Sequence, residues 1–222
     1  MSLVVFLWIE NPRSKRLAVA QAQLEKSILS FGLTPLRFPA GPDLIPIGDV
    51  MAVARRHTTE EGFVWCNSDV VLKQNPFDVP DTGQVYGFHR SEVPSRQISR
   101  GVDMYYISVK WWDEYLSKDI PKLYLGASYV DWWISRAMQN AGAYENLVGY
   151  IDHVTHPKSA AAGSEANSYY QKNFRAYNAW AKRNGLSLIP APPYLIPFIG
   201  HVWGIRNIIL IILSRFNLYG IK

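Results

Sequence analysis

The chain has 222 residues, of which 48% are hydrophobic and 18% charged, so it can bury a core and does not belong to the disordered class. Its net charge of +5 is uneven, because residues 1–165 are net −2 and residues 166–222 are net +7, with no acidic side chain. The slightly acidic body argues against a nucleic-acid-binding domain. The single Cys66 rules out an intramolecular disulfide and a cysteine-rich metal site.

Apolar runs and helical spacings alternate in the first third of the chain. Leu3–Ile9 is a continuous apolar run, typical of a strand buried on both faces. The elements expected after it are a helix over residues 14–31, a short strand at Leu36–Phe38, a helix at Ile47–His57, a buried strand at Gly62–Cys66 and a further apolar run at Val70–Leu72. This order predicts a mostly parallel sheet in an α/β domain.

The second half continues the mixture of strands and helices. The expected elements are a strand at Val85–His89, a polar loop over Arg90–Arg100, a strand at Asp103–Val109, helices at Trp111–Leu116 and Ala127–Asn140, a strand at Leu147–Ile151 and a helix at Ser168–Arg183. Proline-rich residues 190–197 read as a linker. We expect one domain over residues 1–185 and an appendage over residues 186–222.

A polar triplet, Asn67-Ser68-Asp69, directly follows the buried strand Gly62–Cys66. In open α/β sheets, ligands bind at the carboxyl ends of strands. A carboxylate there can hold Mg²⁺ or Mn²⁺, which bridges two phosphate oxygens of a nucleotide. The same three residue types favour a β-turn, which is the simpler interpretation of the triplet alone.

The context of the triplet resembles a known family. Residues 62–72 are similar to the DXD region of GT-A-type glycosyltransferases, where a buried strand delivers a short acidic motif to the phosphates of a sugar nucleotide. Other segments resemble one bacterial glycosyltransferase-like group in the same order, namely Ile47–Asp49, Gly101–Ser108 followed by Trp111-Trp112, Leu125-Gly126 followed by Asp131–Trp133, and Ile151–His156. The resemblance covers roughly residues 3–185. It departs from the motif at Asn67, which leaves Asp69 as the only carboxylate of the triplet.

The resemblance implies a GT-A-like, mixed but mostly parallel sheet flanked by helices. It implies transfer of a sugar from a nucleotide-diphosphate sugar to a hydroxyl acceptor, either a glycan or a lipid-linked group. Asp69 would hold Mn²⁺ or Mg²⁺, with Asn67 and Ser68 beside the donor. The resemblance also places His153 and His156 as metal ligands, of which His156 is favoured, and surface or second-sphere histidines are the alternative.

Candidate donor contacts come from three further segments. They are Trp8, Glu10, Asn11 and Arg13 after the first strand, where GT-A proteins bind the base and ribose, Arg55 and Arg56 on the helix before the triplet, and Lys158 near the end of the domain. For Arg55 or Arg56, and for Lys158, an ordinary solvated side chain is the alternative. The polar loop Arg90–Arg100 either orders over the donor or is a mobile surface segment.

Asp131 stands near the start of an apolar helix, between Val130 and Trp132. Burial among such neighbours raises the pKa of a carboxyl group, as a general base needs. The alternative is a first-turn aspartate that faces the helix dipole. The resemblance favours an acceptor- or sugar-binding role, including that of the base in an inverting reaction. Asp103 has the same ambiguity.

Residues 197–216 mix apolar and basic side chains without any acid, and Ile205, Ile208, Ile209, Ile212 and Phe216 share a helical face. This resembles an interfacial amphipathic helix, and a helix packed on protein is the alternative. Without a signal peptide or an uninterrupted apolar span, the sequence predicts a cytoplasmic protein, at the inner face of the membrane if the tail binds there.

Two other functions remain open. One is a catalytically weak or inactive, membrane-peripheral protein that binds sugar nucleotides or carbohydrate, which the lone carboxylate of Asp69 keeps in view. The other is a sugar-1-phosphate nucleotidyltransferase, which normally carries a glycine-rich loop after its first strand. Residues 9–16 contain no glycine, which counts against that activity.

Overall fold

The computed structural model describes residues 2–9, 15–39, 44–59, 61–93, 95, 98–126, 129–142, 144–154 and 164–189. The chain divides into two compact units, Met1–Trp180 and Ala181–Lys222, and the first contains the sheet. The elements in chain order are β1 (Leu3–Trp8), α1 (Lys15–Ser30), β2 (Thr34–Pro39), α2 (Ile47–His57), β3 (Gly62–Cys66), β4 (Val70–Leu72), β5 (Val85–Val93), β6 (Ile98–Ser108), α3 (Val109–Glu114), the 3-10 turn Leu116–Lys118, α4 (Val130–Asn140), β7 (Tyr144–Val154) and α5 (Ser164–Arg183).

Seven strands form one mixed sheet in the order β2-β1-β3-β6-β5-β7-β4. β1 pairs in parallel with β2 and β3, and β5 pairs in parallel with β7. β6 is antiparallel to both β3 and β5, and β4 is antiparallel to β7. The predicted α/β fold with a mixed sheet is therefore confirmed, although only three of the six strand pairings are parallel. It follows that β1, β2, β3, β5 and β7 all end at one edge, which we call the carboxyl edge.

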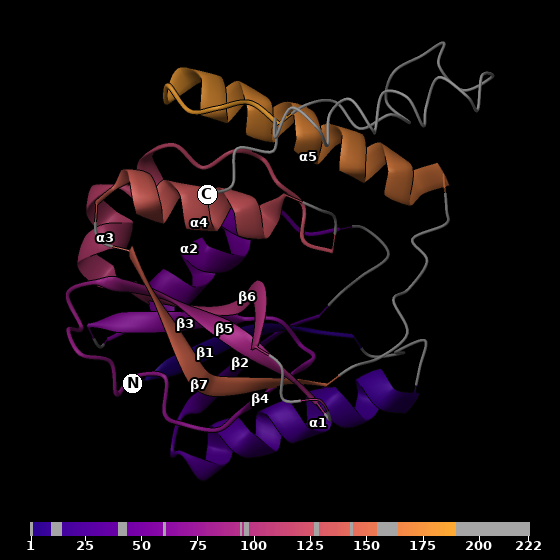
Figure 1. The fold of residues 1–222 in the computed structure, drawn as a ribbon, viewed down its shortest axis with the longest axis vertical. Coiled ribbons are helices and arrows are strands. Elements are labelled where there is room, and N and C mark those ends of the chain that lie inside the picture. Colours follow the sequence, from indigo (N-terminus) through magenta and orange to yellow (C-terminus); the bar gives the residue numbers. More distant parts are fainter. Residues whose placement is uncertain are drawn as a thin grey trace. The chain divides into compact units, whose positions relative to one another are not determined.

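Helices cover the two faces of the sheet. Figure 1 shows α1 on one side and α2, α3 and α4 on the other. Val4 and Val64 pack with Leu24 and Ile28 of α1 in one core cluster. Side chains alternate along a strand, so Phe63 faces the other layer, where its ring lies 6.0 Å from that of Trp112 in α3. Both strand faces are buried, which explains why β1 and β3 are continuous apolar runs.

The polar loop predicted for Arg90–Arg100 is wrong. β5 extends to Val93 and β6 begins at Ile98, so most of that segment is the far part of a long hairpin. The extension is possible because β7 is also longer than predicted, and its end pairs with Arg90–Val93 of β5. Backbone pairing continues past the apolar core, and ion pairs of the polar side chains described below take the place of apolar packing.

No helix in the described residues is both long and apolar enough to cross a membrane. The linker and most of the tail, residues 190–222, lie outside the described residues. The domain boundary at residue 185 and the membrane role of the tail therefore stay predictions.

Candidate active site

Polar side chains from four strands gather at the carboxyl edge. Asp69 follows β3, and the strand register pairs Glu92 of β5 with His153 of β7. β6 runs the other way, and Asp103 lies in the middle of this strand, one residue before the Met104 that pairs with Cys66 at the end of β3. Residues far apart in the sequence thus meet, because β3, β5 and β7 end at this edge and the antiparallel strand β6 passes between β3 and β5. We call Asp69, Arg90, Glu92, Asp103, Asp131 and His153 the edge cluster.

Asn67 fixes the position of Asp103. The backbone N–H of Asn67 donates to the carbonyl oxygen of Asp103 at 2.8 Å, and its Nδ2 donates to Asp103 Oδ1 at 2.9 Å. An aspartate at this position would place a second carboxylate against Asp103, which is only 5% exposed. The departure from the acidic motif therefore has a structural reason, because the amide supplies the hydrogen-bond donor that a carboxylate lacks.

His153 lies between two carboxylates. Its Nδ1 is 2.7 Å from Glu92 Oε2, and its Nε2 is 3.3 Å from Asp69 Oδ2. The hydrogen bond to Asp69 and that to Glu92 raise the pKa of His153. Burial acts to raise the pKa of Glu92, but the hydrogen bonds and positive charges of His153 and Arg90 together outweigh it, so the pKa lies below its ordinary value. The arrangement favours an imidazolium that bridges Asp69 and Glu92.

Arg90 forms ion pairs with two carboxylates of the edge cluster, Glu92 and Asp103. Its Nη1 lies 2.9 Å from Asp103 Oδ2, and its Nε lies 2.8 Å from Glu92 Oε1. Burial raises the pKa of Asp103, although the Arg90 guanidinium acts against that rise. Arg90 therefore compensates part of the charge of a carboxylate that folding has removed from water.

Asp131 lies in the first turn of α4, close to the strand residues of the edge cluster. Its carbonyl oxygen accepts a hydrogen bond from the Tyr105 hydroxyl at 3.3 Å. Part of the residue is exposed, but burial of its carboxyl group, followed by the negative charge of Asp103 and with a contribution from Asp69, raises its pKa to about 7. The prediction of a raised pKa at Asp131 is confirmed, and the cause is burial together with nearby carboxylates.

Two other predicted donor contacts lie near the ends of β1 and β3. Trp8 is the last residue of β1, and the guanidinium carbon of Arg37 lies 4.4 Å from its ring centroid. Ser68 is partly exposed in the turn between β3 and β4. The predicted site residues Glu10, Asn11, Arg13, His156 and Lys158 lie outside the described residues.

The structure does not bring Arg55 to the edge cluster. Arg55 lies in the last turn of α2, where its Nε and Nη2 are 3.1 Å and 2.9 Å from the two carboxylate oxygens of Asp113. A helix between parallel strands returns the chain to the amino ends of the strands, so the end of α2 is at the opposite edge of the sheet. An open hollow of about 470 Å³ also lies at that opposite edge, lined by Thr59, Glu61, Thr82, Gly83, Ser108, Val109 and Lys110.

Within the described residues, no three His, Cys, Asp or Glu side chains are arranged as a metal-binding group. Asp69 and His153, two of the three predicted ligands, are hydrogen-bonded to each other. Their carboxylate oxygen and imidazole nitrogen are donors that suit Mn²⁺. Metal ligation by Asp69, His153 and His156 stays a prediction.

Sequence reasoning missed Glu92 and the role of Arg90, because both were assigned to a loop. A signal was present, since Arg90 and Glu92 alternate as they would on one face of a strand. Their side chains meet one another at 2.8 Å.

The chain was also compared with known proteins. No protein-family model and no curated protein matches it in sequence. Its structure is similar to the catalytic domain of Drosophila β1,4-galactosyltransferase 7 in complex with xylobiose, with a TM-score of 0.50, 9% identity, and coverage of 78% of this chain and 81% of that chain. It is also similar to S. aureus TarS 1–349 in complex with UDP-GlcNAc, with a TM-score of 0.51, 11% identity, and coverage of 82% and 66%. The chain has the GT-A glycosyltransferase fold. The resemblance seen in the sequence is thereby confirmed for the fold, and the edge cluster lies at the carboxyl edge of a GT-A sheet.

Proposed function

We propose that the chain is a glycosyltransferase that moves a sugar from a nucleotide-diphosphate sugar to a hydroxyl acceptor. The observation that carries the proposal is the meeting of Asp131, whose pKa is about 7, with Asp69 and His153 at the carboxyl edge of a GT-A sheet. A base poised near neutral pH beside groups suited to a phosphate-bound cation is what sugar transfer to a hydroxyl requires.

The charges of the edge cluster support an anionic donor that arrives with a divalent cation. Four carboxylates face one guanidinium and one imidazole, so negative charge is in excess. Asp69 and His153, with His156, would hold Mn²⁺ or Mg²⁺, and His153 would release the proton that it shares with Asp69 when the ion binds. When bound, that ion would neutralise the charge that develops on the leaving nucleoside diphosphate. TarS, which was solved with UDP-GlcNAc, supports the donor class by analogy of fold.

The remaining donor contacts are assigned from the sequence. They are Trp8, Glu10, Asn11 and Arg13 for the base and ribose, Asn67 and Ser68 beside the diphosphate, and Lys158 for a phosphate. Arg55 has no part in this assignment because it is paired with Asp113 at the opposite edge of the sheet.

Asp131 acts on the acceptor. Its carboxylate takes the proton of the acceptor hydroxyl while that oxygen attacks the anomeric carbon and the bond from carbon to the diphosphate oxygen breaks. Near pH 7 the carboxylate is substantially ionised and still basic enough to hold the proton. Burial maintains that basicity, and the charges of Asp103 and Asp69 add to it, because they disfavour a third carboxylate beside them.

The acceptor is a glycan or a lipid-linked group. In the second case, residues 186–222 would hold the protein at the cytoplasmic face of a membrane through their apolar and basic side chains. Deleting residues 198–222 should then abolish partitioning into anionic liposomes. Unchanged partitioning would contradict the membrane role and leave the catalytic proposal intact.

Thermal unfolding with a panel of nucleotide sugars and Mn²⁺ tests the proposal. One donor should raise the Tm of the wild type, because a ligand that binds only the folded state stabilises it. Asp69→Asn should lose that shift, whereas the matched control Asp113→Asn, at the opposite edge, should keep it. Transfer of the same sugar to a hydroxyl acceptor should then require Asp131. A shift without transfer would indicate a binding protein, and no shift with any donor would refute the proposal.

A further inference from the structure

Tyr129, the residue that precedes α4, has a backbone that is unfavourable for its type. Its φ is 83° and ψ is −8°, and it is the only non-glycine with positive φ in the described part of the chain. For a bulky residue this left-handed conformation costs on the order of 1–3 kcal/mol and persists only where the surroundings enforce it. Tyrosine is also a poor N-cap, and its side chain makes no capping hydrogen bond here.

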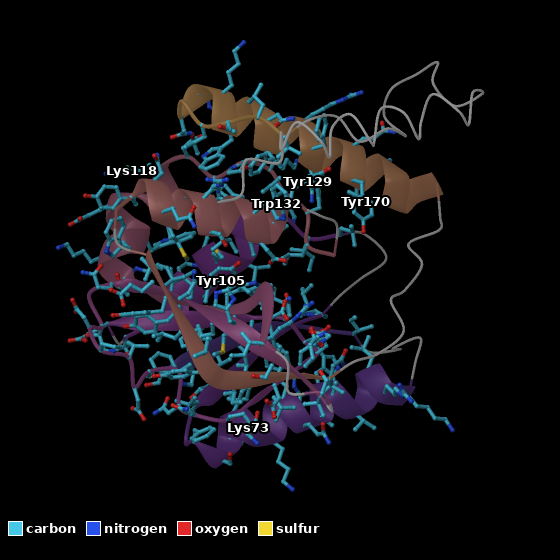
Figure 2. The ribbon with its side chains drawn as sticks, viewed as in Figure 1. Lys73, Tyr105, Lys118, Tyr129, Trp132 and Tyr170 are labelled. Carbon is cyan, nitrogen blue, oxygen red and sulfur yellow. The ribbon has the colours of Figure 1, made fainter. Side chains whose placement is uncertain are left out.

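Aromatic packing explains why tyrosine occupies this position. The Tyr129 ring lies 5.9 Å from that of Phe174 and 6.2 Å from that of Tyr177, two residues on one face of α5. Trp132 of α4 meets it edge-on at 6.4 Å and 78°. Figure 2 shows Tyr129 and Trp132 where α4 and α5 approach one another. The contacts with α5 offset the backbone cost, since aromatic pairs contribute about 0.5–1.5 kcal/mol each beyond their burial.

The first turn of α4 is thereby held from two sides. The carbonyl oxygen of Tyr129 accepts the backbone N–H of Trp133 at 3.0 Å, which is the first hydrogen bond of the helix. From the sheet, the Tyr105 hydroxyl reaches the carbonyl oxygen of Asp131. Asp131 lies two residues after Tyr129, so the angle at which the chain enters the helix decides where its carboxyl group points.

We propose that Tyr129 is a positioning residue, whose ring, held by Phe174 and Tyr177 of α5, maintains the left-handed turn that fixes the first turn of α4 and, with it, Asp131. The inference rests on the proposed function, because it assigns Tyr129 to the reaction in which Asp131 is the base. It also has a readout in stability that does not depend on activity.

Kinetics test the catalytic part. Tyr129→Ala removes the ring but keeps a Cβ, and it should lower kcat at least tenfold while the donor Kd changes less than twofold. Tyr129→Phe, which keeps the ring, should stay within threefold of the wild type. Tyr115→Ala is the matched control, because it removes an exposed ring stacked on Trp111 at the end of α3. A Tyr129→Ala variant with a kcat no lower than that of the control would overturn the proposal.

The pH profile separates positioning from general damage. In the wild type, activity should rise with pH as Asp131 loses its proton near pH 7. Burial contributes most to this pKa; of the charged groups, Asp103 and Asp69 raise it and Arg90 lowers it, and none of these is altered in Tyr129→Ala. If Asp131 turns toward water in that variant, the acidic limb moves to lower pH. A limb that stays in place would contradict the inference.

A double-mutant cycle in urea tests the geometry without any substrate. Asp131→Asn should stabilise the protein more at pH 8 than at pH 5, because it removes a carboxylate whose ionisation disfavours the folded state. In a Tyr129→Ala background this pH-dependent gain should fall by at least half, and in a Tyr129→Phe background it should persist. An undiminished gain in Tyr129→Ala would overturn the inference even if the chain transfers sugar. Failure of the wild type to bind any donor would overturn the proposed function alone.

Discussion

Replacing Asp131 by asparagine should make the protein more stable at neutral and alkaline pH. Burial and the charge of Asp103 raise the pKa of Asp131 from 3.8 to about 7. Because the pKa is higher in the folded state, the unfolded chain releases this proton first, and stability falls as pH rises from about 4 to about 7. At 1.36 kcal/mol per unit, the difference corresponds to about 4 kcal/mol. This value is an upper limit, because solvent at the exposed part of the residue screens the charge.

The assay is urea unfolding of both proteins at pH 5 and pH 8. About 2.5 kcal/mol of the relative gain should develop between those two values if the full limit applies. For a domain of this size, each 1 kcal/mol also corresponds to roughly 2–4 °C in Tm. Asp113→Asn is the control, and it should lower the stability instead of raising it, because the hydrogen bond to Arg55 lowers the pKa of Asp113. A gain for Asp131→Asn that is equal at both pH values would refute the argument that its carboxyl group is buried beside negative charge.

Three further predictions concern the scaffold. Asn173→Ala should cost about 2–3 kcal/mol in urea unfolding, because the buried amide bonds both the N–H and the C=O of Tyr124 at 2.8 and 2.9 Å; a loss below 0.5 kcal/mol, as at an ordinary surface site, would contradict it. Gly62→Ala should cost about 1–3 kcal/mol, since a Cβ would lie 2.5 Å from the Tyr106 ring, and an unchanged midpoint would show that the ring moves freely. Burial raises the pKa of the Cys66 thiol, so iodoacetamide should label it only in unfolded protein, and rapid labelling of the native state would be the contrary result.

The sheet could be predicted largely from residue patterns. Runs such as Leu3–Trp8 and Gly62–Cys66 are apolar on both faces, and the helical spacing of α1 is clear, so β1, α1 and β3 follow directly from the sequence. The strands of the second half were harder to predict, because β5 and β7 carry polar residues near their carboxyl ends. These polar ends are strands because they pair with each other, as Glu92 does with His153. The spacing of apolar residues along one segment does not show which segment it pairs with.

The candidate site divides in the same way. Asp69 and Asp131 stand beside apolar runs, but a β-turn and a first-turn helix aspartate were the alternatives, and the resemblance to GT-A glycosyltransferases selected them. Arg90 and Glu92 were not selected, because their importance comes from contacts with Asp103 and His153, across other strands. The role of Asn67 as a hydrogen-bond donor to Asp103 was also invisible, since nothing in the sequence indicates that the two residues meet.

The edge cluster contributes to the net negative charge of residues 1–165. The negative charges of Asp69 and Asp103 raise the pKa of Asp131, and that of Asp69 acts to raise the pKa of Asp103, which destabilises the fold unless a cation compensates. Arg90 and a protonated His153 compensate only part of that charge in the chain alone. A cluster built only for stability would be better served by apolar side chains of similar size. The retention of excess negative charge at this edge therefore favours a site that binds a cationic group over a purely structural network.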